Sequence, residues 1–231
     1  MVKNKKIIDI CDISTYPKDL LMKFKSEKCN DNDIENNIED YYSMIKDYNI
    51  LCFHFTRLLS AKEVLDNGLK RFDKDETVER VIKEYKKMYK NDHECEIIKK
   101  EADIWISQYN NGEKDNSKQG QLCFVIGKNK KLSNYSSLYC MFGGEFISNF
   151  TKKYEFHKKL INIGESYCVS FKIPISYIKK YQRGTLLESI IKIMLSNYRN
   201  NKDNNLDGKL YNIDIRKDYI ISVEKTNKTY M

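Results

Sequence analysis

Two short segments of this sequence hold the side chains best suited to chemistry, and the first surrounds His54. His54 lies in the apolar run Ile50–Thr56, directly before Arg57. Such a run is typical of a buried strand, in which His54 and Thr56 would share a face. An imidazole, a hydroxyl and a nearby guanidinium could bind the ribose and phosphate of a nucleotide. The alternative is a histidine satisfied within the core beside an incidental arginine.

The second segment contains Tyr139, the pair Gly143–Gly144 and Glu145. The chain has only nine glycines, and two together are costly unless the backbone turns sharply or approaches another group closely. Lysines surround Glu145 in the sequence and should keep it ionised. An ionised carboxylate could stabilise developing positive charge or orient a hydroxyl. The simpler alternative is a helix C-cap glycine followed by a surface glutamate.

The elements that must position these groups begin with a strand, a tight loop and a short helix after His54. Ser60 and Glu63 have the spacing of a capping box, in which serine and glutamate satisfy free amides at a helix start. Asn67–Gly68 supplies a left-handed C-cap that ends this helix. The sequence therefore predicts a helix of about seven residues directly after the strand.

The rest of the chain alternates between helical and strand patterns. Apolar spacing predicts amphipathic helices over 15–28 and 33–47, and an apolar helix over 185–198. Two charged helices are expected over 75–109, and a helical segment containing Tyr135 is interrupted by Gly143–Gly144. Strands are expected over 122–126, 167–173, 209–215 and 218–224, the last two as an antiparallel pair. This order predicts an α+β fold, with a helical N-terminal appendage over 1–49 and a charged helical insertion over 75–115 within a domain spanning 50–231.

The net charge of +8 is unevenly distributed along the chain. Residues 1–50 are net −2, residues 51–121 are neutral, and residues 122–231 are net +10. A local basic field favours an anionic partner such as a nucleotide, a nucleic acid or an acidic protein surface. The alternative is a lysine-rich composition that only decorates the solvated surface.

Composition excludes several classes of protein. No run approaches the roughly 20 apolar residues of a membrane span, and no signal peptide is visible, so no membrane partner is expected. The seven cysteines are scattered without a CxxC spacing, which indicates a reducing cytoplasm rather than a disulfide framework. With three histidines, no metal-ligand cluster can be drawn from spacing.

A resemblance adds to this interpretation. Phe53–Arg57, the capped helix and Asn67–Leu69 resemble the opening of bacterial ADP-ribosyltransferase-like domains of the His–Tyr–Glu type. The later Tyr139, Gly143–Glu145 and the apolar strand before Pro174 are also similar to members found among toxins and phage-defence proteins. The resemblance covers about residues 50–183.

The resemblance implies a split mixed sheet that grips NAD as a substrate. His54 and Thr56 would hold a ribose, Arg57 the pyrophosphate, and Tyr139, or its rival Tyr135, would stack on nicotinamide. A glutamate would stabilise the oxocarbenium-like transition state. Two glutamates remain open for this role: Glu145 has the glycine context, and Glu165 directly precedes a strand.

The leading hypothesis is therefore a nucleotide-binding glycosyltransferase: an NAD-consuming ADP-ribosyltransferase or NAD glycohydrolase. It would act as a toxin or phage-defence effector on a nucleic-acid or protein acceptor, with a partner protein or antitoxin. The alternative is a catalytically degenerate member of the fold that binds nucleic acid or protein through tyrosines interleaved with lysines. A nuclease is weaker, because no paired-carboxylate metal site stands out.

Overall fold

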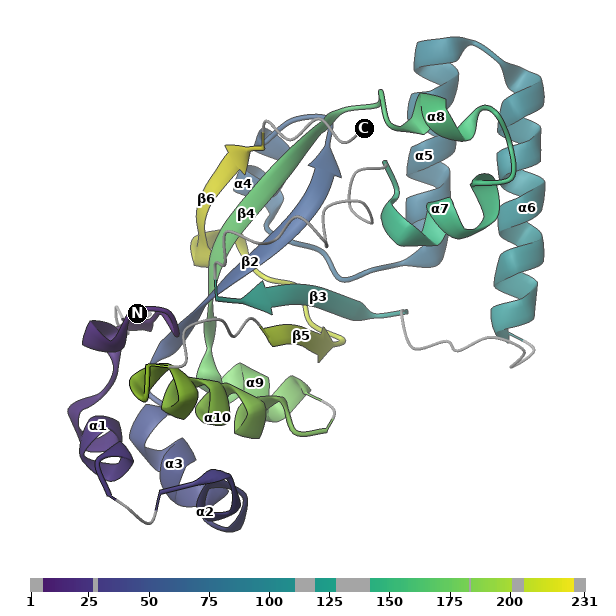
Figure 1. Cartoon of the computed structure of the whole chain (residues 1–231). Coiled ribbons are helices and arrows are strands. Elements are labelled where there is room, and N and C mark those ends of the chain that lie inside the picture. The colour runs from purple at the N-terminus through teal and green to yellow at the C-terminus, as the bar shows by residue number, and fades with distance from the viewer. Residues whose placement is uncertain are drawn as a thin grey trace.

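A six-stranded sheet runs through the centre of the protein (Figure 1). The computed structural model describes residues 6–26, 29–110, 119–127, 142–182, 184–200 and 206–226. The strands are β1 (Ile7–Ile8), β2 (Asn49–Leu58), β3 (Gln121–Ile126), β4 (Glu165–Pro174), β5 (Leu206–Tyr211) and β6 (Ile220–Lys225). Their order is β5–β3–β2–β4–β6, and β1 pairs with β2 in parallel at its start. The predicted α+β class is confirmed.

The central strand β2 is held very differently on its two edges. Against β4 it is paired antiparallel along its whole length, from Asn49 opposite Pro174 to Leu58 opposite Glu165. Against β3 it is paired at two positions, one of which is Phe53 opposite Val125. All six residues of β3 nevertheless pair with β5. The sheet therefore forks: β3 and β5 diverge from β2 beyond Phe53.

Helices form two groups on either side of this fork (Figure 1). The first group surrounds the lower end of the sheet and contains α1 (Lys18–Phe24), α2 (Asp31–Asn36), α3 (Ile38–Ile45), α9 (Ile175–Tyr181) and α10 (Leu186–Tyr198). Their apolar faces and the sheet bury one hydrophobic core, which includes Ile8, Tyr41, Phe171 and Ile191. The expected N-terminal appendage thus packs into the main core.

The second group has a hydrophobic core of its own. It contains α5 (Lys74–Tyr89), α6 (Asp92–Asn110), α7 (Gly144–Thr151) and α8 (His157–Leu160). Val81 and Tyr85 of α5 and Ile98 of α6 are buried there against Phe146 and Phe150 of α7. The two charged helices predicted over 75–109 are confirmed, and the segment 142–160 completes their core.

The short helix α4 (Lys62–Asn67) follows β2 as predicted. The Glu63 carboxylate accepts hydrogen bonds from the amides of Leu59 and Ser60 (2.8 and 3.1 Å), and the Ser60 hydroxyl accepts one from the Lys62 amide. Gly68 ends the helix with φ +79° and its amide bonded to the Val64 carbonyl. The Glu63 half of the predicted capping box and the glycine at the helix end are confirmed. The Ser60 hydroxyl, however, bonds the Lys62 amide instead of the Glu63 amide, and Gly68 has ψ −167°, outside the left-handed helical region.

One pairing predicted from the sequence is wrong. The last two strands were expected as an antiparallel hairpin, yet β5 pairs with β3 and β6 pairs with β4, at opposite edges of the sheet. A 3₁₀ turn at Lys217–Tyr219 and the bridge between Leu69 and Ile215 carry the chain across. Local alternation identifies a strand but does not say which neighbour supplies its hydrogen bonds.

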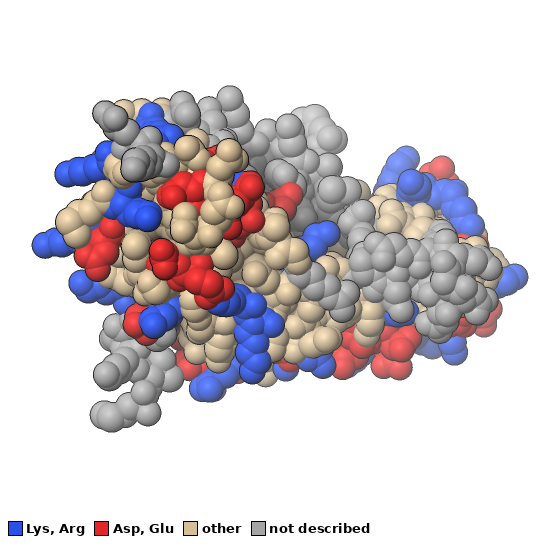
Figure 2. Space-filling view, turned by 90° about the horizontal axis from the view of Figure 1, so that it is seen from below, with Lys and Arg blue, Asp and Glu red and all other residues tan. Residues whose placement is uncertain are grey.

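The acidic N-terminal segment and the basic second half of the chain meet in space. Lys179 of α9 bonds Glu39 of α3 (2.7 Å), and Lys192 of α10 pairs with Glu35 of α2. Figure 2 shows red and blue side chains intermingled on the face seen from below. The segregation of charge along the sequence is therefore partly cancelled by the fold.

Within the described residues, no helix combines the length and the apolar character that crossing a membrane requires.

Candidate functional site

A cavity of about 370 Å³ lies at the fork of the sheet. This volume is within the range of small-molecule sites. Residues from four segments line it: His54–Arg57 of β2, Gln121–Cys123 of β3, Lys70–Asp73 with the first two turns of α5, and Phe142, Gly143, Gly144 and Phe146 around the start of α7. Strands β2 and β3 and the second helical group thus border this space.

The segment before α5 is fixed against β3 by main-chain hydrogen bonds. The Phe72 amide donates to the Gln121 carbonyl (2.7 Å), and the Gly120 amide donates to the Phe72 carbonyl (2.9 Å). Further back, Leu69 and Ile215 exchange two hydrogen bonds of 2.8 Å each. Main-chain hydrogen bonds therefore hold this loop in place on the cavity wall.

His54 bridges the fork with its side chain. Its Nδ1 lies 2.7 Å from the Cys123 carbonyl oxygen. A carbonyl can only accept, so Nδ1 carries the proton, and in the neutral ring Nε2 is an acceptor. Burial lowers the pKa of His54 from its ordinary value near 6.5, and the bond to Cys123 opposes this only in part. His54 therefore enters the cavity as a neutral imidazole of fixed tautomer.

The lowered pKa of His54 makes stability depend on pH. The unfolded chain binds a proton near pH 6.5 and the folded chain binds it at lower pH, so stability should fall as pH drops below about 6.5. His157 has a pKa lowered by burial and by Lys152 and contributes in the same direction. Urea unfolding at pH 7.5, 6.5 and 5.5 should show a smaller loss in His54→Asn than in the natural chain. Equal losses in both proteins would contradict the assignment.

Aromatic rings and a hydroxyl face the cavity beside His54. Phe55, Phe72, Phe142 and Phe146 all line it, and the rings of Phe72 and Phe146 meet edge to face with centroids 5.2 Å apart. Thr56 lines the same space, and its hydroxyl makes no hydrogen bond with the described residues. The walls offer flat apolar surface for a ring system and a free hydroxyl for a polar group.

Arg57 lines the cavity, but its guanidinium is directed at the turn before β4. Nε donates to the Ile163 carbonyl (2.8 Å), and the two terminal nitrogens donate to the Gly164 carbonyl (2.9 Å) and the Ser166 hydroxyl (3.0 Å). Three of its five donors are used in this way. Arg57 braces β2 against the turn at 163–166.

Loss of the Arg57 brace should destabilise the fold. Arg57→Ala removes three hydrogen bonds and leaves two carbonyls without their donors, so the free energy of unfolding should fall by about 2–3 kcal/mol. Arg57→Lys should recover only part of this, since one ammonium cannot reproduce the planar fork. Urea titration measures both. Arg216, exposed and paired with Asp218, is the control: Arg216→Ala should change stability by about 0.5 kcal/mol or less.

The two adjacent glycines, Gly143 and Gly144, are required for different reasons. Gly143 precedes α7 with φ +89°, and a Cβ there would lie 2.4 Å from a methylene carbon of Ile147 and 2.7 Å from a methyl of Val81. Gly144 has φ +66°, and nothing lies within 4 Å of its added Cβ. The first glycine is required by packing and by backbone conformation, and the second by conformation alone.

Alanine at these two positions should have unequal effects. Both variants carry the strain of a left-handed residue, about 1–2 kcal/mol. Gly143→Ala should lower the free energy of unfolding by a further ~1–3 kcal/mol, because Ile147 and Val81 must move in a packed core. Thermal or urea unfolding of the two variants side by side gives the difference. Equal stabilities would show that the contacts at Gly143 are relieved without cost.

The candidate glutamates lie at different places. Glu145 is in the first turn of α7, next to the two glycines of the cavity wall, and its side chain lies outside the described atoms. Glu165 begins β4 opposite Leu58 and does not line the cavity, and an ion pair with Lys225 of β6 lowers its pKa. Tyr135 and Tyr139 lie outside the described residues. Of the nine predicted site residues, the structure brings His54, Thr56, Arg57, Gly143 and Gly144 to one cavity.

Several charged residues of the cavity were missed in the sequence. Lys70, Arg71 and Arg80 and the carboxylates Asp73 and Glu76 line it. Their segment is net neutral, so a search for basic stretches passes over it. The sequence feature that could have pointed to them is the turn at Asn67–Gly68, which places the following cations beside the strand.

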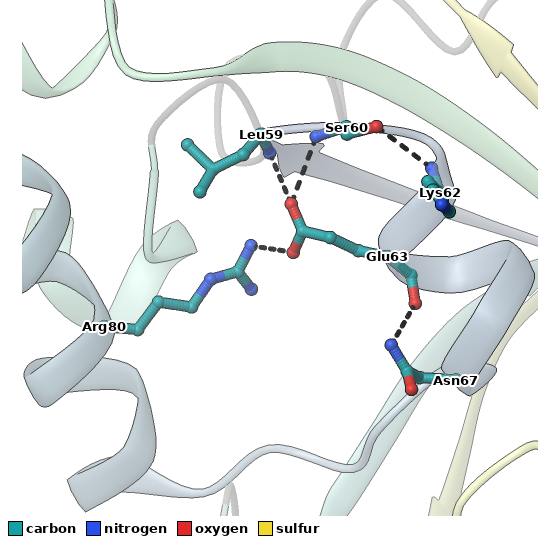
Figure 3. A network of polar contacts seen from close by, with 6 residues as sticks. All are labelled: Leu59, Ser60, Lys62, Glu63, Asn67 and Arg80. Atoms are coloured by element: carbon teal, nitrogen blue, oxygen red, sulfur yellow. Dashed lines mark hydrogen bonds and ion pairs between the residues drawn. The ribbon is translucent and has the colours of Figure 1, made fainter.

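Arg80 connects the cavity wall to the cap of α4, as Figure 3 shows. Its guanidinium pairs with the free oxygen of the Glu63 carboxylate and lies 4.9 Å from the centre of the Phe142 ring. The same Glu63 carboxylate bonds the amides of Leu59 and Ser60. One carboxylate therefore fixes the end of β2, the start of α4 and a cation over the aromatic wall.

Two of the described lysines that follow the glycine motif are paired with glutamates of α6. Lys153 lies 2.7 Å from Glu101 and Lys159 lies 2.8 Å from Glu94, both glutamates being on α6. These pairs join α7 and α8 to α6 on the side of the second core. The cations that border the cavity come instead from β2 and from the segment 70–80.

No family model, no curated protein and no solved structure matches this chain. Its function is therefore argued from the cavity and the residues that line it.

Proposed function

We propose that this chain is an NAD-consuming ADP-ribosyltransferase or NAD glycohydrolase that binds NAD at the fork of the sheet. One observation carries the proposal: residues singled out around His54 and around Gly143, almost 90 positions apart, line the same cavity. The forked sheet supports it, because the split sheet is the architecture that the resemblance implies. His54 borders this cavity rather than the apolar helix α10, as an enzymatic role requires.

In this proposal, His54 and Thr56 bind a ribose of NAD. The neutral imidazole accepts a hydrogen bond from a ribose hydroxyl at Nε2, and the Thr56 hydroxyl can donate or accept. The aromatic wall receives a planar ring, with Tyr139 or Tyr135 as the stacking residue that the resemblance implies. Both rings of NAD are then held by flat apolar contacts, and the pyrophosphate by a cation.

The reaction breaks the bond between the ribose C1′ and the nicotinamide nitrogen. The bonding electrons leave with nicotinamide, which departs neutral, and positive charge develops on the ribose. A carboxylate stabilises that charge, and we assign this role to Glu145 because Gly143 and Gly144 beside it line the cavity. Water or an acceptor nucleophile then bonds to C1′ and loses its proton. Preorganised electrostatic groups of this kind contribute several kcal/mol.

The acceptor and setting follow from the same proposal. A nucleic acid or a protein would receive the ADP-ribose, with the chain acting in the cytoplasm as a toxin or phage-defence effector. Uncontrolled NAD consumption harms the producing cell, so a partner protein or antitoxin is expected to restrain it.

Incubation of the protein with NAD tests the proposal. Free nicotinamide should accumulate, and label from the adenine half should remain as ADP-ribose or pass to an added macromolecule. Glu145→Gln should stop the release and Glu165→Gln should leave it unchanged. Salt-sensitive binding to DNA or RNA without nicotinamide release would instead support the non-catalytic alternative, a degenerate binding module.

A further inference from the structure

Most cations of the cavity already have a partner within the protein. Arg57 donates to the turn at 163–166. Lys70 lies 3.2 Å from the Asp214 carboxylate, and Arg80 pairs with Glu63. Arg57 and Arg80 cannot turn to a ligand without giving up contacts that brace β2 and the start of α4, and Lys70 is an exposed residue already paired with Asp214.

Arg71 is different. Its backbone is fixed, since the Arg71 amide donates to the Asp214 carboxylate (2.9 Å) and the next residue, Phe72, is bonded to Gln121. Its side chain is exposed and lines the cavity, and its guanidinium makes no hydrogen bond or ion pair with the described residues. A fixed backbone that presents an unengaged guanidinium suits recognition of an anion.

The two carboxylates of the cavity also differ in whether they have partners among the described residues. Asp73 caps α5 by accepting a hydrogen bond from the Glu76 main-chain amide (3.0 Å), and it accepts another from the Gln119 side-chain amide (2.7 Å). These hydrogen bonds lower the pKa of Asp73. Glu76 lies one turn further on, exposed and lining the cavity, and its carboxylate makes no contact of either kind with the described residues. Among the described lining residues, Arg71 and Glu76 are thus one cation and one anion without a hydrogen bond or ion pair of their own.

We propose that Arg71 and Glu76 form a nucleoside diphosphate subsite: Arg71 binds a phosphoryl group, and Glu76 accepts a hydrogen bond from a hydroxyl or amino group of the nucleoside. A guanidinium matches phosphate oxygens with two parallel donors. A carboxylate in the same cavity repels a bare polyphosphate but favours a ligand that also carries hydrogen-bond donors. The subsite deepens the proposed function, since it names the residues that would hold the ADP half of NAD.

Binding of ADP tests this subsite without any chemical step. Calorimetric titration of the natural chain with ADP should give a measurable affinity. Arg71→Gln should weaken ADP binding at least tenfold and leave adenosine binding unchanged. Glu76→Gln should weaken ADP binding several-fold and leave inorganic pyrophosphate binding equal or stronger. Arg216→Gln removes one exposed guanidinium outside the cavity and should change nothing.

The outcomes separate the subsite from the proposed enzymatic function. Unaltered ADP affinity in Arg71→Gln, or no ADP binding by the natural chain, overturns the subsite. If nicotinamide release persists in that case, the NAD-consuming function stands with a different phosphate-binding residue. If ADP binds through Arg71 and nicotinamide is never released, the subsite stands and the enzymatic proposal falls. The melting temperature of each variant should match the natural chain, since both side chains are exposed and unengaged.

Discussion

Replacing His54 with asparagine should stop nicotinamide release while the protein stays folded. The asparagine side-chain amide places an N–H donor near the position of Nδ1, so it can keep the bond to the Cys123 carbonyl. It has no counterpart of Nε2, the acceptor that the proposal assigns to ribose. We expect nicotinamide release to fall at least a hundredfold, or about 3 kcal/mol of transition-state stabilisation.

A second substitution at the same position separates the two roles of the ring. His54→Gln extends an amide toward the position of Nε2 but loses the bond that joins β2 to β3. It should retain more activity than His54→Asn and unfold at a lower urea concentration. Full activity in His54→Asn would exclude the ribose-binding role and leave His54 as a structural bridge at the fork. Nicotinamide release and urea midpoints, measured on the same preparations, decide between these outcomes.

Gly68→Ala should be the most destabilising glycine substitution in the chain's described part. An added Cβ would lie 2.0 Å from the Ile215 carbonyl oxygen and 2.9 Å from the backbone of Arg216 and Lys217. These are main-chain atoms, and Ile215 is bonded to Leu69 in both directions. The clash must therefore break that bridge and displace the loop that carries Arg71. We expect a loss of more than about 3 kcal/mol in unfolding free energy.

Gly184 supplies a matched control for this prediction. Its φ is also +79°, and nothing lies within 4 Å of an added Cβ. Gly184→Ala should therefore lose only the conformational strain of a left-handed residue, about 1–2 kcal/mol. Thermal unfolding, or the soluble yield if Gly68→Ala does not fold, gives the comparison. Equal stability of the two variants would refute the close approach at Gly68.

The part of the fold closest to His54 could be predicted from the sequence because its signals are local. An apolar run, a capping glutamate and an Asn-Gly end describe consecutive residues, and the strand, the short helix and its end lie where these signals predict. The pairing of β5 and β6 could not be predicted in this way. Which strands lie side by side depends on contacts between residues far apart, such as Leu69 with Ile215.

The residues of the candidate site also fall into those that local sequence signals reveal and those that depend on contacts between distant residues. His54, Thr56 and the two glycines were found from residue type and local context. The turn at Asn67–Gly68 places Arg71 beside the strand, but nothing local distinguishes Arg71 or Glu76 from an ordinary solvated residue. Their significance depends on which neighbours engage the other charges of the cavity, and that information is held in the tertiary contacts. Arg57 is the opposite case. The sequence singles it out, yet its guanidinium donates to the turn at 163–166.

The fork of the sheet also bears on how the protein is made. β3 meets β2 at two residue pairs, and its other edge is held by β5, near the end of the chain. The loop that carries Arg71 is tied to Ile215, and the main core joins Ile8 to Leu210. During synthesis on the ribosome, His54 would emerge long before the strand that completes its cavity. The nascent chain would therefore hold no assembled binding site until β5 and Ile215 have been translated.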